Sequence, residues 1–457
     1  MMAVLSVLFF YTFADKVDTY LVGSDLEVYF LLLSTLFILF INSQLKNVIL
    51  EFLNTFFVFF YIMRIPFLFS DSVSSDVLTR DVNIDDIPWY LMVLATQYLF
   101  FSIAIIVVNP KISKDLIVDI VSEKVFKRVL FFCFVVIFFN ILRRVYYFDI
   151  HGGNTLNFFW SILGSIFSGK NILMALIILL FVSGKNLISK YKYIIFSLIS
   201  VSIMQYLYGG SKSIFFELLL LVYLASLVVH GPLKLKLGGL ILMLLGGFIA
   251  IFSYFFGIVS RAMHLQNIDY NIINVLHEYN KRFDYEIFDF IDGFSYRVGY
   301  LDFFLQKVSN PVYGVYVNFQ YYFESIIDRI TPGFDIFGVP FTTSALYAAF
   351  TGNHNSANSE FVTVFGEGYI IFGFFSFFFY SAILLLIKYF IFQSKSSYTF
   401  NRALFRLFIM MSFYLWLRGP GLDMVFLVAM YKGIFVIFLM TIVKYDSVNF
   451  IPRIRRI

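Results

Sequence analysis

Long apolar runs alternate with short polar connections along most of the chain, and this pattern predicts its helices. Twelve runs approach the roughly 17 to 25 residues that a helix needs to cross a membrane. They cover residues 1–13, 27–42, 49–69, 87–108, 128–148, 171–184, 192–208, 213–229, 236–258, 361–391, 402–418 and 422–444. The first run is short, and the sixth is long enough only if it takes in residues before Lys170, so we expect ten to twelve spans.

One stretch, residues 261–360, departs from this pattern. It divides the chain into residues 1–260 with spans one to nine, the polar loop 261–360, and residues 361–457 with the last three spans and a basic tail. Helical apolar spacing over 271–307 predicts one or two amphipathic helices at the membrane surface. Closely spaced Pro and Gly predict turns over 310–341. The aromatic and aliphatic content of this stretch argues against disorder.

The amino-acid composition excludes a water-soluble globular protein. Of the 457 residues, 60% are hydrophobic and only 14% are charged, whereas about a quarter of a typical soluble domain is charged. We therefore expect an all-α polytopic integral membrane protein with about 12 transmembrane helices and one large external loop. The single cysteine, Cys133, lies in an apolar run and is expected to be a small core residue. The first run lacks the basic start and the cleavage site of a secretory signal, so it is expected to be a retained helix.

The basic residues indicate the sidedness of the loops. Every second connection is basic, and the residues concerned are Lys111, Lys114, Lys124, Lys127 and Arg128, then Lys185, Lys190 and Lys192, then Lys234 and Lys236, then Lys388, Lys395, Arg402 and Arg406, and finally Lys444, Arg453, Arg455 and Arg456. By the positive-inside rule, these connections and both termini are cytoplasmic. Residues 261–360 are then external, and their six basic and eleven acidic residues give a net charge of −5. Trp89, Trp160 and Trp416 fall near outer ends of runs, as interface anchors do.

One histidine stands out as a candidate general base. His354 lies in the run Asn-His-Asn-Ser just before the tenth span, between small hydrogen-bonding residues. The alternative is a loop histidine that bonds the backbone of its neighbours. No two histidines have i, i+4 spacing and no carboxylates cluster as metal ligands do, so neither a metal site nor a cofactor is predicted. The absence of a nucleotide-binding glycine motif and of a nucleic-acid-like basic patch argues against ATP coupling and a nucleic-acid partner.

Basic residues on the outer side form the candidate anion site, because guanidinium groups suit bidentate phosphate contacts. The candidates are Arg143, Arg144, Lys212, Arg261, Arg297 and Arg418. Lys212 ends a Gly-Gly-Ser-Lys turn whose glycines would let backbone N–H groups approach a phosphate at the start of a helix. Arg418 opens the short hairpin Arg-Gly-Pro-Gly-Leu-Asp. The alternative for each is lipid headgroup binding or an ion pair, for Arg418 with Asp423.

Three carboxylates lie in or beside apolar runs, where charged groups are costly and usually functional. Glu360 and Glu367 flank the start of the tenth run and are candidate catalytic residues. Glu217 lies in the eighth run. As alternatives, Glu217 pairs with Lys212, and Glu360 caps a helix N-terminus, where a carboxylate is electrostatically favoured.

Several of these features together resemble a known family. They are the dozen predicted helices, the long external loop, the Gly-Gly-Ser-Lys turn, and two runs, Asn353-His354-Asn355-Ser356 and Gly366-Glu367-Gly368-Tyr369-Ile370-Ile371-Phe372-Gly373. In these respects the chain resembles the bacterial Wzy-type O-antigen or oligosaccharide repeat-unit polymerases and, more distantly, the O-antigen ligases. The resemblance implies a GT-C-type membrane glycosyltransferase that uses neither a metal nor a nucleotide sugar.

The resemblance also implies substrates, location and roles. Such enzymes join repeat units carried on undecaprenyl diphosphate at the external face of the bacterial inner membrane. The external arginines would correspond to the family's diphosphate-binding arginines, and His354 to the histidine that precedes a late helix in the ligases. His354 or Glu367 would act as general base. The bilayer and the lipid-linked glycans are the expected partners, with a chain-length regulator protein as a further candidate.

Two alternatives remain open at this point. A lipid-linked oligosaccharide flippase or another secondary transporter would also need cationic groups in a helical bundle, although no internal repeat relates the two halves. A metal-dependent GT-C enzyme would use the acidic residues of the first external loop, Asp15, Asp18 or Asp25.

Overall fold

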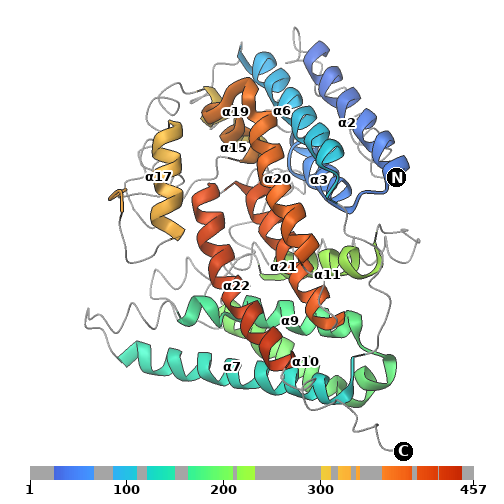
Figure 1. Cartoon of the computed structure of the whole chain (residues 1–457), viewed down its shortest axis with the longest axis vertical. Coiled ribbons are helices and arrows are strands. Elements are labelled where there is room, and N and C mark those ends of the chain that lie inside the picture. The colour runs from blue at the N-terminus through green and yellow to red at the C-terminus, as the bar shows by residue number, and fades with distance from the viewer. Residues whose placement is uncertain are drawn as a thin grey trace, which may run out of the picture. The chain divides into compact units, whose positions relative to one another are not determined.

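The structure is a computed structural model that describes residues 25–65, 86–110, 121–149, 163–208, 214–231, 300–309, 318–330, 336–339, 363–393, 399–419 and 421–444. The regular elements of these residues are all helices, with no strand among them (Figure 1). The α-helices are α2 (Asp25–Leu45), α3 (Val48–Phe60), α6 (Ile87–Val108), α7 (Glu123–Asp149), α9 (Gly169–Val182), α10 (Lys185–Tyr208), α11 (Ile214–His230), α15 (Tyr300–Ser309), α17 (Phe319–Ile330), α19 (Val364–Phe372), α20 (Ser376–Gln393), α21 (Thr399–Arg418) and α22 (Leu422–Lys444). Two 3₁₀ turns, η1 (Ile62–Arg64) and η3 (Gly373–Phe375), join them.

Seven helical stretches of the described residues are long and apolar enough to cross a membrane. They are Leu26–Leu45, Ile87–Val108, Glu123–Leu142, Leu163–Val182, Lys185–Met204, Val364–Ile391 and Leu422–Val443. The sixth predicted run does take in residues before Lys170, because its span begins at Leu163. The chain is therefore a helical membrane protein, while the count of twelve spans stays a prediction.

The tenth run is not one continuous α-helix. It forms α19 and α20 with η3 between them, and Gly373 at the break has a φ of +54°. A residue with a side chain rarely adopts this conformation. The carbonyl of Gly373 accepts a hydrogen bond from the backbone N–H of Ser376, and it also accepts a hydrogen bond of 3.2 Å from Gln97 Nε2 on α6. A carbonyl oxygen can accept two such bonds, and the bond from Gln97 joins the break to α6.

Two expectations for the polar loop need correction or refinement. The prediction of turns throughout 310–341 is wrong, because α17 is a 12-residue helix. Its Pro and Gly neighbours in the sequence lie before and after it, and none interrupts Phe319–Ile330. The amphipathic pattern predicted up to residue 307 does end in a helix, α15, but its apolar side is buried against α6 and α19. Residues 271–299 lie outside the described residues.

The described helices belong to two compact units, each assembled from three separate parts of the chain. Unit 1 comprises residues 1–112, 285–392 and 412–428, and unit 2 comprises residues 113–284, 393–411 and 429–457. Helices α21 and α22 each have residues in both units.

Aromatic side chains form the core of unit 1. Phe57 on α3 stacks on Tyr98 of α6 with ring centroids 3.9 Å apart, and Phe365 of α19 meets Phe57 edge-on at 5.5 Å. Trp416 packs against Phe101 at 5.1 Å and is only 1% exposed. The expectation that Trp416 anchors the interface is therefore wrong, because its indole fills the core. Trp89 is 57% exposed, as an interface anchor should be.

Two polar bonds show that α6 and α20 of unit 1 run in the same direction. The Tyr380 hydroxyl of α20 donates to Gln97 Oε1 in the middle of α6 at 2.8 Å. Further along, Lys388 Nζ donates to the carbonyl of Val108 at the end of α6 at 2.6 Å. Helices α6 and α20 thus run parallel, which the predicted topology requires of the fourth and tenth spans.

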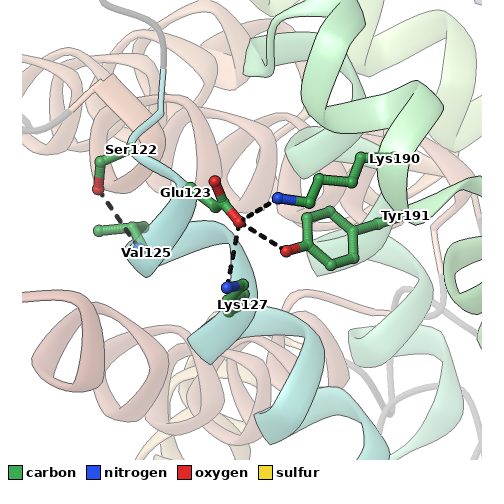
Figure 2. A network of polar contacts seen from close by, with 6 residues as sticks. All are labelled: Ser122, Glu123, Val125, Lys127, Lys190 and Tyr191. Atoms are coloured by element: carbon green, nitrogen blue, oxygen red, sulfur yellow. Dashed lines mark hydrogen bonds and ion pairs between the residues drawn. The ribbon is translucent and has the colours of Figure 1, made fainter.

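In unit 2, helices α7 and α10 are joined at their N-terminal ends by a polar network (Figure 2). Oε1 of Glu123 accepts bonds from Lys190 Nζ at 2.9 Å and from the Tyr191 hydroxyl at 2.7 Å. Lys127, one turn along α7, forms an ion pair with the same oxygen at 3.1 Å. Cys133 is buried in α7, which confirms its expected place in the core.

Candidate functional site

The candidate site is the junction of α19 with the turn that joins α21 to α22, both in unit 1. This turn, residues 418–422, carries the predicted anion-binding Arg418, and α19 carries the predicted catalytic Glu367. Two contacts described below, one through Gly419 and one through Leu422, join them. The structure therefore brings together two candidates that lie about fifty residues apart in the sequence.

Thr363, which precedes α19, has a strained backbone. Its φ of +66° and ψ of 149° lie in a region that a β-branched residue rarely adopts. The residue is wholly buried, and its Oγ1 accepts a hydrogen bond of 3.2 Å from the backbone N–H of Gly366. The hydroxyl of Tyr61 lies beside it. Strained residues held in this way cluster at functional sites.

Gly419 holds the turn against Thr363. Its φ is +74°, and its N–H donates to the carbonyls of Leu415 and Trp416 at 3.2 and 2.9 Å, which ends α21. A Cβ atom at position 419 would overlap the backbone of Thr363. Only glycine therefore permits both the left-handed turn and the close approach of the two backbones.

Glu367 holds the end of the same turn, where α22 begins, through a hydrogen bond to Leu422. Its carboxylate is 1% exposed, and Oε1 accepts a hydrogen bond of 2.9 Å from the N–H of Leu422, the first residue of α22. An acceptor at a helix N-terminus satisfies a free N–H group and is favoured by the helix dipole. The polar ends of Tyr322 and Trp416 also face the carboxyl group. Among the described residues, no hydrogen bond reaches Oε2 of Glu367.

Helix α17 of the polar loop is fixed to this junction. Ser325 Oγ donates to Asp423 Oδ2 at 2.6 Å, and Asp423 is wholly buried. Asp328 on the same helix accepts bonds from the N–H groups of Phe337 at 3.0 Å and Val339 at 2.9 Å. Asp423 therefore has a defined partner in Ser325, whereas the predicted ion pair with Arg418 stays a prediction.

Arg418 is half-buried at the end of α21. A second arginine of unit 1, Arg64 at the end of η1, is 1% exposed and was not among the sequence candidates. The sequence could have identified Arg64 by its position inside the apolar run 49–69, because ionisable residues within membrane segments are usually functional.

Most other predicted site residues cannot be placed. Arg143 and Arg144 lie in the last two turns of α7, and their side chains lie outside the described part. Five further candidates are also outside the described residues, namely Lys212, Arg261, Arg297, His354 and Glu360. For these residues the assigned roles stay predictions.

Glu217 has a different partner from the one considered from the sequence. Its Oε1 pairs with Lys170 Nζ at 2.6 Å, which joins the first turn of α11 to the start of α9 in unit 2. Lys432 of α22 lies near both groups and was missed in the sequence. This charged group, Lys170–Glu217–Lys432, is distinct from the junction in unit 1.

The comparisons with known proteins give no family assignment. No protein-family model, curated protein or solved structure matches this chain. The case for a function therefore rests on the chemistry of the residues.

The junction offers one cationic group from the predicted set, the guanidinium of Arg418. Across the described ranges, no three His, Cys, Asp or Glu side chains are arranged to hold a metal. Arg418 instead precedes a rigid turn that is held by Thr363 on one side and Glu367 on the other. A guanidinium held at a fixed turn would cost little reorganisation when negative charge develops beside it.

Proposed function

We propose that the chain is a membrane glycosyltransferase that polymerises oligosaccharide repeat units carried on undecaprenyl diphosphate into an O-antigen or capsule-type polysaccharide. The proposal rests on the sequence resemblance, and one observation supports it: Arg418 belongs to a turn that buried contacts fix to the start of α19. The reaction would take place at the external face of the bacterial inner membrane, which is the side that the positive-inside rule predicts for this turn.

In the proposed reaction, a hydroxyl oxygen of the acceptor sugar forms a bond to the anomeric carbon of the donor sugar. The bond between that carbon and the diphosphate oxygen breaks, and undecaprenyl diphosphate leaves with the electron pair. Arg418 and the external-loop Arg297 would stabilise the charge that develops on the diphosphate. The proton of the attacking hydroxyl passes to a general base.

His354 and Glu367 remain the two candidates for this base, and the packing of Glu367 favours a different role for it. A base must reach the proton that it removes, whereas Glu367 is 1% exposed and bonded to Leu422. We therefore assign Glu367 as a positioning residue that holds the Arg418 turn. His354 is then the candidate base.

Two substitutions at Glu367 separate these roles. Glu367→Gln keeps an oxygen that accepts the Leu422 N–H but removes the basic carboxylate, so polymer synthesis should stay within about three-fold of wild type. Glu367→Ala leaves that N–H without its acceptor, at a cost of about 1–3 kcal/mol, and should reduce synthesis strongly. Equal loss in both variants, at matched membrane levels, would make Glu367 the base.

The arginine role is tested by Arg418→Ala and Arg297→Ala in a strain that lacks the native gene. In each variant, the lipid carrier should hold a single repeat unit and no polymer should form, while the protein still inserts into the membrane. Lysine at either position should restore little, because a point charge cannot make the bidentate contact. Normal polymer ladders from both alanine variants would remove these arginines from the site.

A transporter of lipid-linked oligosaccharides is the second candidate, favoured by the charged group Lys170–Glu217–Lys432. Lys432 lies near the middle of the 23-residue helix α22, and charged groups at that depth usually mark transport pathways. The glycan profile of a deletion strain distinguishes the two. One repeat unit on the carrier at the external face indicates a polymerase, and none there indicates a flippase.

A further inference from the structure

Unit 2 has an apolar groove with one arginine at its end. The groove lies between α7 and α22, has a volume of about 780 Å³, and is lined by aromatic and aliphatic side chains together with Thr441 and Arg128. This volume is within the roughly 300–1,000 Å³ of pockets that hold small ligands. Neither the junction nor the proposed reaction uses it.

The floor of the groove is rigid. Phe132 of α7 packs against Phe435 and Phe438 of α22, each with ring centroids 5.7 Å apart. Phe167 closes on both rings of α22 at 6.4 and 6.0 Å. Interlocked aromatic rings of this kind hold the two helices apart at a fixed spacing, so the groove is part of the fold.

The walls of the groove face lipid. Phe131 on α7 is 69% exposed and Ile437 on α22 is 63% exposed, and both lie in helices that are long and apolar enough to span the membrane. An apolar side chain exposed at that depth is in contact with hydrocarbon chains. A lipid of the surrounding bilayer is therefore the expected occupant of the groove.

The length of the groove matches one leaflet. Its lining residues run from Arg128 to Val135 along α7 and from Ile434 to Ile442 along α22. Seven to eight residues of α-helix span about 10–12 Å, which is most of the roughly 15 Å that one leaflet contributes to the hydrocarbon core. A single acyl chain that enters beside Arg128 would fill it.

The arginine end of the groove lies at the membrane interface. Arg128 is one and a half turns from the start of α7, where Glu123, Lys127, Lys190 and Tyr191 form the polar network of Figure 2. Glu123 is the one acidic member, so the basic groups outnumber it. Arg128 can extend its guanidinium toward this level while its methylene stem stays among apolar groups.

We propose that this groove binds one anionic phospholipid, with its phosphate on Arg128 and one acyl chain along α7 and α22. The positive end selects an anionic headgroup, as basic pockets between membrane helices do. The site is separate from the junction in unit 1, so it stands whether or not the chain is a glycosyltransferase.

The test is native mass spectrometry of the purified full-length protein, titrated with phosphatidylglycerol or phosphatidylcholine of the same acyl chains. Wild type should bind the first phosphatidylglycerol about five-fold more tightly than the first phosphatidylcholine. This factor corresponds to the roughly 1 kcal/mol typical of one basic residue near an anionic membrane. Arg128→Gln should remove this preference, and Arg128→Lys should keep most of it. Ile437→Trp, which fills the groove but keeps Arg128, should weaken binding of both lipids.

Lys185→Gln is the matched control, because Lys185 is an exposed lysine of α10 that does not line the groove. It should retain the wild-type preference. If Lys185→Gln lowers the preference as much as Arg128→Gln, the attraction is spread over the whole basic surface, and the site is refuted. An unchanged preference in Arg128→Gln, or unchanged lipid binding in Ile437→Trp, also refutes it.

Discussion

The close approach of Gly419 to Thr363 makes a prediction about stability and activity together. In Gly419→Ala, the new residue must adopt a φ of +74°, and its Cβ would overlap the Thr363 backbone. A left-handed conformation costs an L-residue about 1–2 kcal/mol. Forcing extra atoms into a packed site costs about 1–3 kcal/mol more. The variant should therefore lose about 2–5 kcal/mol of unfolding free energy.

The variant Gly338→Ala separates the cost of the left-handed backbone from the cost of the overlap with Thr363. Gly338 belongs to the same unit and has a φ of +65°, but a Cβ atom there would meet nothing within 4 Å. This control should lose only the conformational part, about 1–2 kcal/mol. The difference between the two variants then measures the contact of the turn with Thr363.

Both variants can be compared in detergent by chemical unfolding followed through tryptophan fluorescence, since Trp416 lies in the core of unit 1. Polymer synthesis should fall in Gly419→Ala, because the shifted turn carries Arg418, and should be nearly normal in Gly338→Ala. If the two variants unfold within about 0.5 kcal/mol of each other, a difference typical of neutral substitutions, the Gly419 contact does not fix the turn.

Three further outcomes are expected. Glu217→Gln should lower the unfolding free energy by about 1–2 kcal/mol, less than the ~3–5 kcal/mol of a buried pair because Lys170 is 37% exposed; an unchanged unfolding curve would show that the ion pair adds nothing. A cysteine at position 310 should react with a membrane-impermeant reagent in intact cells and one at position 185 should not, and the reverse result would invert the topology. Activity of the purified protein on lipid-linked repeat units should survive EDTA; loss of activity with recovery in Mg²⁺ or Mn²⁺ would favour the first-loop aspartates.

The membrane helices were largely predictable because of one physical constraint. Inside a bilayer each backbone N–H and C=O group needs a partner within its own segment, so a long apolar run is a helix whatever surrounds it. Helices α6 and α22 therefore match their predicted ranges. The break at Gly373 was not predicted, because the side chain that contacts it, Gln97, belongs to a helix far away in the sequence.

Side-chain partners were less predictable, since they depend on which helices are neighbours. Trp89 and Trp416 occupy similar positions at the ends of apolar runs, yet one is exposed and the other is in the core. Glu217 pairs with Lys170, 47 residues away, rather than with the nearby Lys212. The sequence identified Glu367 as special, but its role as a cap for α22 follows only from the packing.

The bonds of Gln97 also constrain how the protein is made. Its amide group donates to Gly373 and accepts from Tyr380, and these partners are synthesised 276 and 283 residues later. When α6 leaves the ribosome, its central amide enters the bilayer without either partner, at a cost of a few kcal/mol. The nascent N-terminal helices should therefore stay close to the insertion machinery, or to a chaperone that shields their polar faces, until α19 and α20 arrive.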